Sequence, residues 1–445
     1  MKMQLPIGIS RRYAVLGGGV LITIWLWLAL DRKILPTHRI WNAPSKGQLI
    51  SPSVDAFDFP PVDSDEIRAV CSSTKWNESL VFTCDNNHGG IGHVRNSILN
   101  CVRYAIGAGG SLVLPNIALR DEDDMEHDHS HNEKRHGPGR KGMDYMFDVE
   151  HFADSLRMSC PDLVLIKHME ETFSPRRRGL LPEHLFTNVP TSGLEHPEEW
   201  SMRLEAWIHE NMPSYPEKEP IVIDLEQSFL HYPTHSDGHK FAHAFGNILK
   251  FRPDVRRLAT TTLNKLSEWY ELPLNISEPI MKPSFMGAHL ETGNPFLEQR
   301  HNVDVAYSHF QAQCAAYIEL ATSSHTPLMY VASGNLPEIH KLGLLATSAS
   351  IAVTHKEDLL KDKDMEQLEM LKWDQRALVD YLVLLKAQDF AGVGHSSFSW
   401  QVAVTRHESG DHRKGVLESD VWSDGLSTLY GVRSSYVESS ECMWS

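Results

Sequence analysis

Two glycine-containing segments, far apart in the chain, carry residue types that can bind a phosphate group. The first, GGIGHVR at residues 89–95, follows a short apolar segment and precedes a helical pattern. Glycines let the backbone approach a ligand closely, and an arginine in the first helical turn adds positive charge beside unpaired N–H groups. We therefore predict that Gly89, Gly90, Gly92 and Arg95 line a site for an anion, although a plain strand-to-helix connection has the same pattern.

The second segment, GVGHSSFSW at residues 392–400, places serines directly behind two glycines at the start of a predicted helix. Hydroxyl and N–H groups in this arrangement can bind a diphosphate. We predict that Ser396 and Ser397 bind one here. The alternative is that Ser396 only caps the helix, as one serine at a helix start ordinarily does.

A third segment, DEDDMEHDHSH at residues 121–131, alternates acids and histidines and includes an Asp-x-Asp pattern that suits divalent cations. The segment continues to Gly142 without apolar periodicity, which is typical of an exposed insertion loop. We therefore expect no metal site in the protein.

The elements that must position these segments follow an alternating α/β pattern. A predicted strand at 80–84, the glycine turn, a helix with apolar residues at helical spacing, a Gly109–Gly110 stop and a strand at 112–114 form a mononucleotide-binding type of unit. Further strands are predicted at 162–166, 221–225, 285–290, 328–332, 347–353 and 390–393, and helices at 303–321 and 375–386.

The length of 445 residues predicts two domains with appendages. Prolines between residues 272 and 283 indicate the junction, so we place an N-terminal α/β domain at 67–277 and a C-terminal α/β domain at 278–445. The net charge of −16 would repel a phosphate backbone, which excludes nucleic acid as a partner.

Residues 13–30 carry no charged side chain and are long enough to cross a membrane as a helix. The excess of positive charge before them predicts a signal anchor with a cytoplasmic tail at 1–12. A stem at 31–66 would follow, and the body would lie in the lumen of the Golgi or ER as a type II membrane protein.

Two further features suit a secreted body. The triplets at Asn77 and Asn275 are acceptor sequences for N-glycans, and six cysteines could form disulfides whose pairing the sequence does not give. Because Cys101 and Cys314 fall in helical apolar patterns, we expect both to be small buried hydrophobic residues.

Taken in order, several segments resemble those of the GDP-fucose protein O-fucosyltransferase-like family. The resemblance runs from about residue 80 to 407 and rests on five segments: GGIGHVRNSILN with SLVLP, FDVEHF (147–152), MGAHL (286–290), LMYVASG (328–334) and, most specifically, FAGVGHSSFSW. It implies two facing Rossmann-like domains of the GT-B-like kind, an N-terminal Rossmann-like domain at 67–277 and a C-terminal nucleotide-sugar-binding domain at 278–445. It also implies inverting transfer of a sugar from a nucleotide diphosphate sugar, without metal, to a hydroxyl of a protein or glycan.

The same resemblance implies roles for individual residues. Ser396 and Ser397 would hold the β-phosphate of a GDP-sugar, Phe398 would lie at the nucleotide, and His289 would contact the donor. The acceptor hydroxyl benefits from a base, for which Asp85, His88 and Asp148 are the candidates near strand ends. Each of these three is equally well interpreted as a cap, a turn former or a solvated residue.

One departure from the family pattern concerns Glu291, which stands where the family usually has a phosphate-binding arginine. Two like charges at about 4 Å repel by roughly 4 kcal/mol at an intermediate dielectric. Arg95 or Arg300 would have to compensate. The departure leaves open a rearranged donor site, a different nucleotide sugar, or a lumenal binding protein that kept the fold and lost the donor site. Because no other arginine stands out, we expect Glu291→Arg to tighten binding of GDP.

Overall fold

The computed structural model describes residues 55–120, 139–167, 177–212, 220–228, 231–292, 306–409 and 415–445. The predicted anchor at 13–30, the acidic and histidine-rich stretch at 121–131, and Arg300 lie outside these residues. Among the described residues, no helix is both long and apolar enough to cross a membrane.

The first sheet has five parallel strands in the order β5-β2-β1-β7-β6. Their bounds are β5 Leu165–Ile166, β2 Ser111–Val113, β1 Leu80–Thr83, β7 Ile221–Leu225 and β6 Arg177–Leu180. The predicted strands at 80–84, 112–114, 162–166 and 221–225 correspond to β1, β2, β5 and β7. Beside this sheet, β3 (Asn116–Ala118) pairs with β4 (Arg140–Gly142), so the end of the expected loop is in fact an exposed strand.

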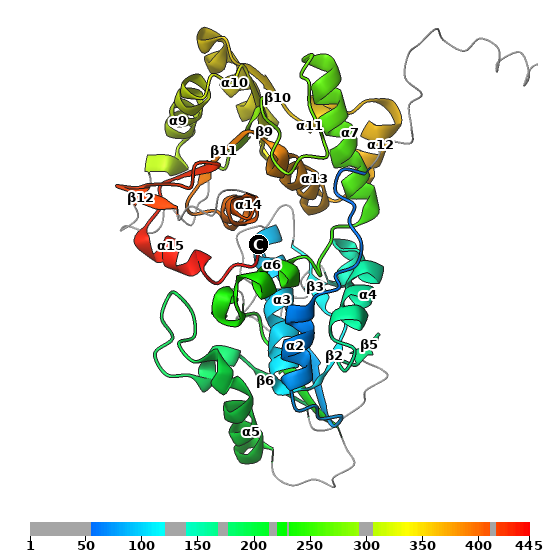
Figure 1. The fold of residues 1–445 in the computed structure, drawn as a ribbon. Helices are drawn as coiled ribbons and strands as arrows, with labels where there is room; N and C mark the ends of the chain where they lie inside the picture. The colour runs from blue at the N-terminus through cyan, green and yellow to red at the C-terminus, as the bar shows by residue number, and fades with distance from the viewer. Residues whose placement is uncertain are drawn as a thin grey trace, which may run out of the picture. The chain divides into compact units, whose positions relative to one another are not determined.

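The second sheet has seven strands in the order β10-β9-β8-β11-β14-β13-β12. It is parallel from β10 to β14 and ends in antiparallel pairs. Its strands are β8 Met286–His289, β9 Leu328–Ala332, β10 Ala352–Thr354, β11 Asp389–Val393, β12 Val416–Glu418, β13 Val421–Ser423 and β14 Ser427–Tyr430. Residues 55–445 therefore contain two α/β sheets, which confirms the expected layered fold class (Figure 1).

Helices cover both sheets (Figure 1). Around the first sheet lie α2 Asp65–Ser73, α3 Ile91–Ala108, α4 Val149–Ser159, α5 Trp200–Asn211 and α6 His239–Gly246. Around the second lie α7 Pro253–Trp269, α9 Phe310–Ser323, α10 Leu336–Ala346, α11 Lys356–Leu359, α12 Asp362–Met370, α13 Trp373–Lys386, α14 Ser397–His407 and α15 Ser434–Ser440.

The helix α3 explains the opening segment of the sequence. Its N-terminal cap is Gly90, and it ends at Gly109, which takes the left-handed conformation with φ +69° that glycine adopts at low cost. The helix is buried on nearly every side, including its polar residues. Such a helix has no solvent face, so its polar side chains must find partners inside the protein.

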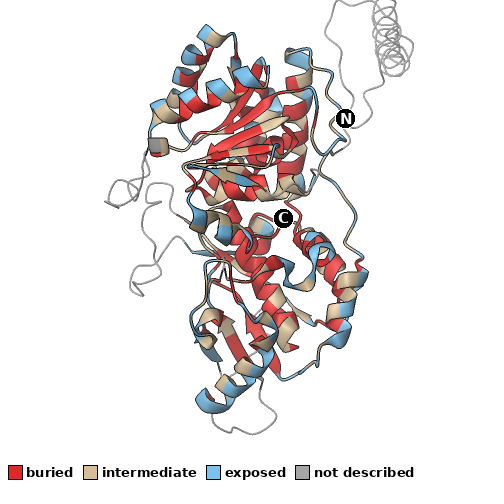
Figure 2. Cartoon of the chain, turned by 60° about the vertical axis from the view of Figure 1, so that its left-hand side comes forward, coloured by how far each residue is buried: buried red, intermediate tan, exposed pale blue. Residues whose placement is uncertain are grey.

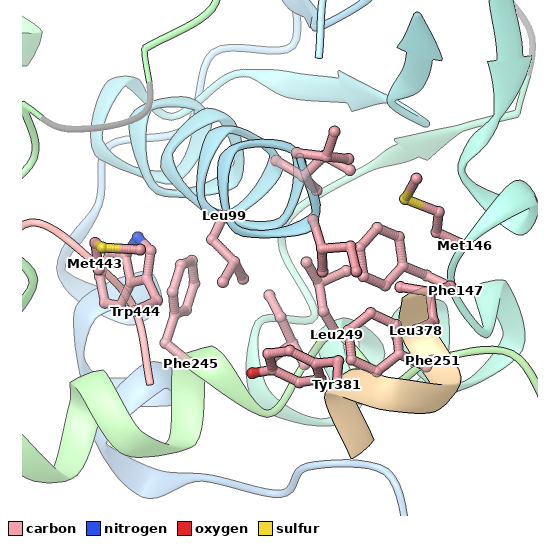
Figure 3. Close-up of a cluster of buried hydrophobic side chains, with 14 of the residues drawn as sticks. Leu99, Met146, Phe147, Phe245, Leu249, Phe251, Leu378, Tyr381, Met443 and Trp444 are labelled. Atoms are coloured by element: carbon pink, nitrogen blue, oxygen red, sulfur yellow. The ribbon is translucent and has the colours of Figure 1, made fainter. Parts of the chain in front are cut away.

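Packing crosses the predicted boundary at residue 277 in both directions. Arg257 of α7 forms an ion pair of 2.8 Å with Asp364 of α12, beside the second sheet. Conversely, the segment 442–445, which follows the second sheet, lies against α3 and α6. Figure 3 shows Trp444 beside Phe245 of α6. The domain boundary stays a prediction, and the two halves share one continuous core (Figures 2 and 3).

Cysteines tie the first half together. Cys71 pairs with Cys160, and Cys84 at the end of β1 pairs with Cys101 in α3. The expectation that Cys101 is an unmodified core residue is therefore wrong, because its position on α3 also faces the strand end. Cys314 is free and buried, as expected.

Both glycan acceptor triplets are exposed. The Asn77 side chain accepts a hydrogen bond of 3.0 Å from the N–H of Ser79, and the Asn275 side chain accepts one of 3.2 Å from the N–H of Ser277. These local turns leave each asparagine at the surface, where a glycan needs it to be.

Candidate functional site

The two glycine-containing segments meet in space. The start of α14 lies against the start of α3, so a Cβ atom on Gly92 would come within 2.6 Å of the carbonyl oxygen of Ser397. The Nδ1 atom of His93 lies 3.5 Å from the Oγ of Ser397. Two helix N-termini, one from each half, therefore converge where the sequence predicted an anion site. Gly92 itself makes room for helix packing rather than for a ligand.

The backbone conformation requires glycine at residue 89, whereas residue 90 has room for a Cβ atom. Gly89 has φ +102°, a conformation that side-chain-bearing residues rarely adopt. A Cβ on Gly90 would lie 3.4 Å from the Oγ of Ser397, an ordinary contact. The turn is therefore shaped by its own backbone and by the approach of α14.

Ser396 is the N-terminal cap of α14, because its side chain accepts a hydrogen bond of 3.4 Å from the N–H of Ser399. The simple capping role considered from the sequence is thus present. Ser397 is half-buried and its hydroxyl faces His93. Of the two serines, Ser397 has the hydroxyl that points towards the junction of the halves.

His289, at the end of β8, is held from two sides. Its Nδ1 lies 2.8 Å from the Oγ of Ser399, which also accepts a hydrogen bond of 3.2 Å from the N–H of Val393. The ring of Phe398 lies 4.5 Å away, centre to centre. Burial lowers the pKa of His289 to about 4, despite the opposing effect of Glu291, so the ring is neutral at pH 7. Ser399 was not predicted as a site residue, because its orienting role shows only in three dimensions.

Two more histidines and a carboxylate share this region. Burial lowers the pKa of His93 to about 4 and also lowers the pKa of His395, and Glu291 opposes both shifts. The Nε2 atom of His395 is buried, with no hydrogen-bond partner among the described residues. Glu291 therefore lies among three neutral imidazoles, with His289 as the third.

Gln313 of α9 fixes the backbone of Glu291. Its side-chain oxygen accepts a hydrogen bond of 3.1 Å from the N–H of Glu291, and its side-chain nitrogen donates to the carbonyl of the same residue. Gln313 is itself fully buried. The backbone of Glu291, the residue that departs from the family pattern, is therefore held in a defined position.

Arg120, just after β3, also belongs to this region and was not predicted. Burial lowers the pKa of its guanidinium, against the effects of Asp374, Glu291 and Tyr145. Its Cζ lies 4.5 Å from the centre of the Trp373 ring. In the sequence, Arg120 is only an arginine that follows a short apolar segment. This pattern is too common to identify a site residue.

The sequence model of the GDP-fucose protein O-fucosyltransferases matches residues 80–409, most of the chain. The chain belongs to this family. No curated protein matches the sequence.

Solved structures with a similar fold include two fucosyltransferases. POFUT1 in complex with GDP-fucose is 15% identical with a TM-score of 0.47, covering 81% of this chain and 99% of that one. NodZ alpha-1,6-fucosyltransferase soaked with GDP-fucose is 14% identical with a TM-score of 0.39, covering 74% and 92%. A NodZ structure from Bradyrhizobium is 13% identical with a TM-score of 0.36, covering 72% and 90%.

The donor of this family is GDP-fucose. Arg95, predicted to line the anion site, makes its hydrogen bonds elsewhere. Its guanidinium is buried and donates to the carbonyl oxygens of Trp444 (2.5 Å), Gly246 (2.8 Å) and Ser445 (2.5 Å). Through these three contacts Arg95 joins α3 to the carboxyl-terminal segment and to α6. Its predicted role at the anion site stays a prediction.

Of the three candidate bases, two lie at the glycine turn. Asp85 follows β1, accepts a hydrogen bond of 2.7 Å from the side chain of Asn116, and lies 3.6 Å from Arg177. His88 is partly exposed, with its Nδ1 3.0 Å from the carbonyl oxygen of Asn86, and its charge would act on His93. His88 is therefore the candidate that lies at the junction.

Asp148, the third candidate, is the N-terminal cap of α4. It accepts a hydrogen bond of 3.1 Å from the N–H of His151, and its other oxygen lies 3.2 Å from a nitrogen of Arg256. The capping role considered from the sequence is therefore present, and its role as a base stays a prediction.

No group of three or more histidine, cysteine, aspartate or glutamate side chains is arranged to hold a metal ion within the part of the chain that the structure describes.

Proposed function

We propose that the protein transfers fucose from GDP-fucose to a hydroxyl group of a protein or glycan in the lumen of the secretory pathway. The observation that carries the proposal is the convergence of the α3 and α14 N-termini, with Ser397 3.5 Å from His93, in a chain of this family. Two helix N-termini concentrate N–H dipoles where a leaving diphosphate develops negative charge.

In this proposal, residues of the second half bind the donor and a residue of the first half accepts the proton of the acceptor. Ser397 and the N–H groups of α14 bind the phosphates, and Phe398 with His289 forms the wall beside the donor. His289 is neutral and oriented by Ser399, so it offers a hydrogen bond without a charge. His88, at the glycine turn, is the group best placed to accept the proton of the acceptor hydroxyl.

A lumenal location is supported by several independent features. Two disulfides require an oxidising compartment in most organisms, and two exposed acceptor triplets suit N-glycosylation. The uncharged stretch at 13–30 would supply the anchor, with the Golgi or ER membrane as its place.

Glu291 favours a second function, that of a lumenal protein that binds without catalysis. Its carboxylate acts on His93, His289 and His395 around the proposed phosphate site, and it opposes a bound diphosphate. Under this alternative, the fold would recognise a glycan or protein partner and would not turn over the donor.

The test measures binding and transfer separately. Full-length protein in detergent is titrated with GDP-fucose, GDP-mannose and UDP-galactose while its melting temperature is followed, since a ligand of the folded state raises it. Labelled fucose is then supplied together with lumenal glycoproteins, and the label on protein is counted. Selective stabilisation by GDP-fucose with label transfer supports the enzyme, and stabilisation without transfer supports the alternative. A chain that GDP-fucose does not stabilise does not have the proposed function.

A further inference from the structure

Arg120 has an unusual setting for a cation. It comes from the strand pair beside the first sheet, yet its guanidinium stacks over Trp373 at the start of α13, at a distance of 4.5 Å. No hydrogen bond or ion pair joins this guanidinium to another residue of the described ranges. Stacking on one face leaves the five N–H donors at its edge available to an oxyanion that lies in its plane.

The surrounding carboxylates do not fully compensate this charge. Asp374 accepts a hydrogen bond of 2.6 Å from the hydroxyl of Tyr145 and another of 2.9 Å from the N–H of Gln375. Glu291 acts on Arg120 but also on three imidazoles. Burial still outweighs the carboxylates in lowering the pKa of Arg120, as expected for a cation that lacks a dedicated partner.

Arg120 is near the proposed donor site. Its charge acts on His93, whose Nδ1 lies 3.5 Å from the Oγ of Ser397. It also acts on Glu291, two residues beyond His289. Because His93, His289 and His395 are neutral at pH 7, Arg120 contributes a full positive charge to a group of side chains that otherwise carries a negative one.

We propose that Arg120 binds the diphosphate of the donor from the side of the first sheet, stacked on Trp373, in a site whose other half is the start of α14. This inference rests on the proposed function for the identity of the nucleotide, but the anion site itself can be tested without it. It also accounts for Glu291, because the positive charge of Arg120, on which the carboxylate acts, offsets the repulsion between that carboxylate and the phosphates.

The experiment compares Arg120→Gln and Arg120→Lys with the parent, all as full-length protein in detergent. Arg157→Gln, which removes an exposed arginine of α4, is the matched control. Calorimetry measures the affinity for GDP, guanosine and inorganic diphosphate. One lost charge-assisted hydrogen bond corresponds to about a 10- to 100-fold change in affinity. We expect Arg120→Gln to lose about this much for GDP and for diphosphate, with guanosine unchanged.

The other variants sharpen the result. Arg120→Lys keeps the charge but loses the planar fork, so it should fall between the parent and Arg120→Gln, while Arg157→Gln should match the parent. Equal affinity for diphosphate in the parent and in Arg120→Gln overturns the inference, as does a parent that binds no diphosphate. An equal loss for guanosine also overturns it, because the residue would then support the fold.

One further outcome separates this inference from the proposed function. If the parent binds inorganic diphosphate, loses it in Arg120→Gln, and binds GDP no more tightly than diphosphate, the anion site stands. The assignment to a guanosine nucleotide then fails.

Discussion

Replacing Arg95 by methionine should destabilise the protein much more than it weakens the binding of GDP. Arg95 is the fifth residue of α3 and is 5% exposed. It donates three hydrogen bonds of 2.5 to 2.8 Å to carbonyl oxygens of residues 246, 444 and 445. Methionine fills much of the same space but leaves those oxygens without a donor.

The size of the effect follows from these contacts. A hydrogen bond to a charged group contributes about 1.5 to 3 kcal/mol, so three would contribute several times that. Removing the guanidinium also removes the cost of burying it, which is visible as the lowering of its pKa by burial. The net loss should be about 3 to 5 kcal/mol, as for other partners removed from buried charged contacts. That is a large part of the stability of an ordinary protein.

Urea unfolding followed by tryptophan fluorescence measures the free energy of unfolding, and calorimetry measures the affinity of the folded variant for GDP. Arg157→Met, at a side chain that is 72% exposed, is the control and should stay within about 0.5 kcal/mol of the parent. The reasoning is refuted if Arg95→Met loses less than about 1 kcal/mol of stability while its affinity for GDP falls by about tenfold or more. Arg95 would then be the ligand residue that the sequence predicted.

Three other changes test the site. Alanine at both Ser396 and Ser397 should weaken binding of GDP by about 10- to 100-fold per lost hydrogen bond. It should also lower the free energy of unfolding by about 1 kcal/mol, because the helix cap is lost. An unchanged affinity in calorimetry would remove the pair from the site. With Arg120 at the diphosphate, Glu291→Arg should weaken binding of GDP by about tenfold, because the new cation would repel the guanidinium of Arg120 from its position over Trp373. Tighter binding in the variant would favour a lost donor site instead. Because burial lowers the pKa of His289 to about 4, the unfolded chain takes up its proton first, so stability should fall as the pH drops from about 6.5 to about 4. The fall in melting temperature between pH 7 and pH 5 should be smaller in His289→Gln, and an equal fall in both proteins would contradict this role of His289.

Much of the fold was predictable because its strands are buried on both faces. Such strands appear in the sequence as short apolar runs. The bounds of β1, β7 and β9 were predicted nearly to the residue. The strand β6 was missed because Arg177 and Arg178 lie on an exposed edge, where neither alternation nor apolar character is needed. The strands β12, β13 and β14 were also missed. Of these, β12 forms the edge of the second sheet, where apolar character is again not needed.

The site was predictable in its segments and less so in its side chains. The glycine turn and the serines stand out because special backbone shapes demand special residues. The contacts of Arg95 and the disulfide of Cys101 were not predicted, because helical spacing gives the face of a helix but not the segment that packs on it. For Arg95 that segment is 442–445, and for Cys101 it is the end of β1. The role of Arg120 depends on Trp373, more than two hundred residues further along the chain, which no local pattern reveals.

The contacts of α3 with the segment 442–445 also constrain how the chain acquires its structure during synthesis. The indole of Trp444 donates to the side chain of Asn100, and Asn96 bonds the backbone of Cys442 and Trp444, across separations of 344 to 348 residues. On the ribosome, the first sheet can form early. The side-chain amides of Asn96 and Asn100 in α3 then lack their hydrogen-bond partners until the segment 442–445, the last one described, has been translated. A nascent first half would expose these polar groups and the surrounding aromatic core for the whole time needed to translate the second. Chaperones should therefore associate with the nascent chain until residues 442–445 have been synthesised.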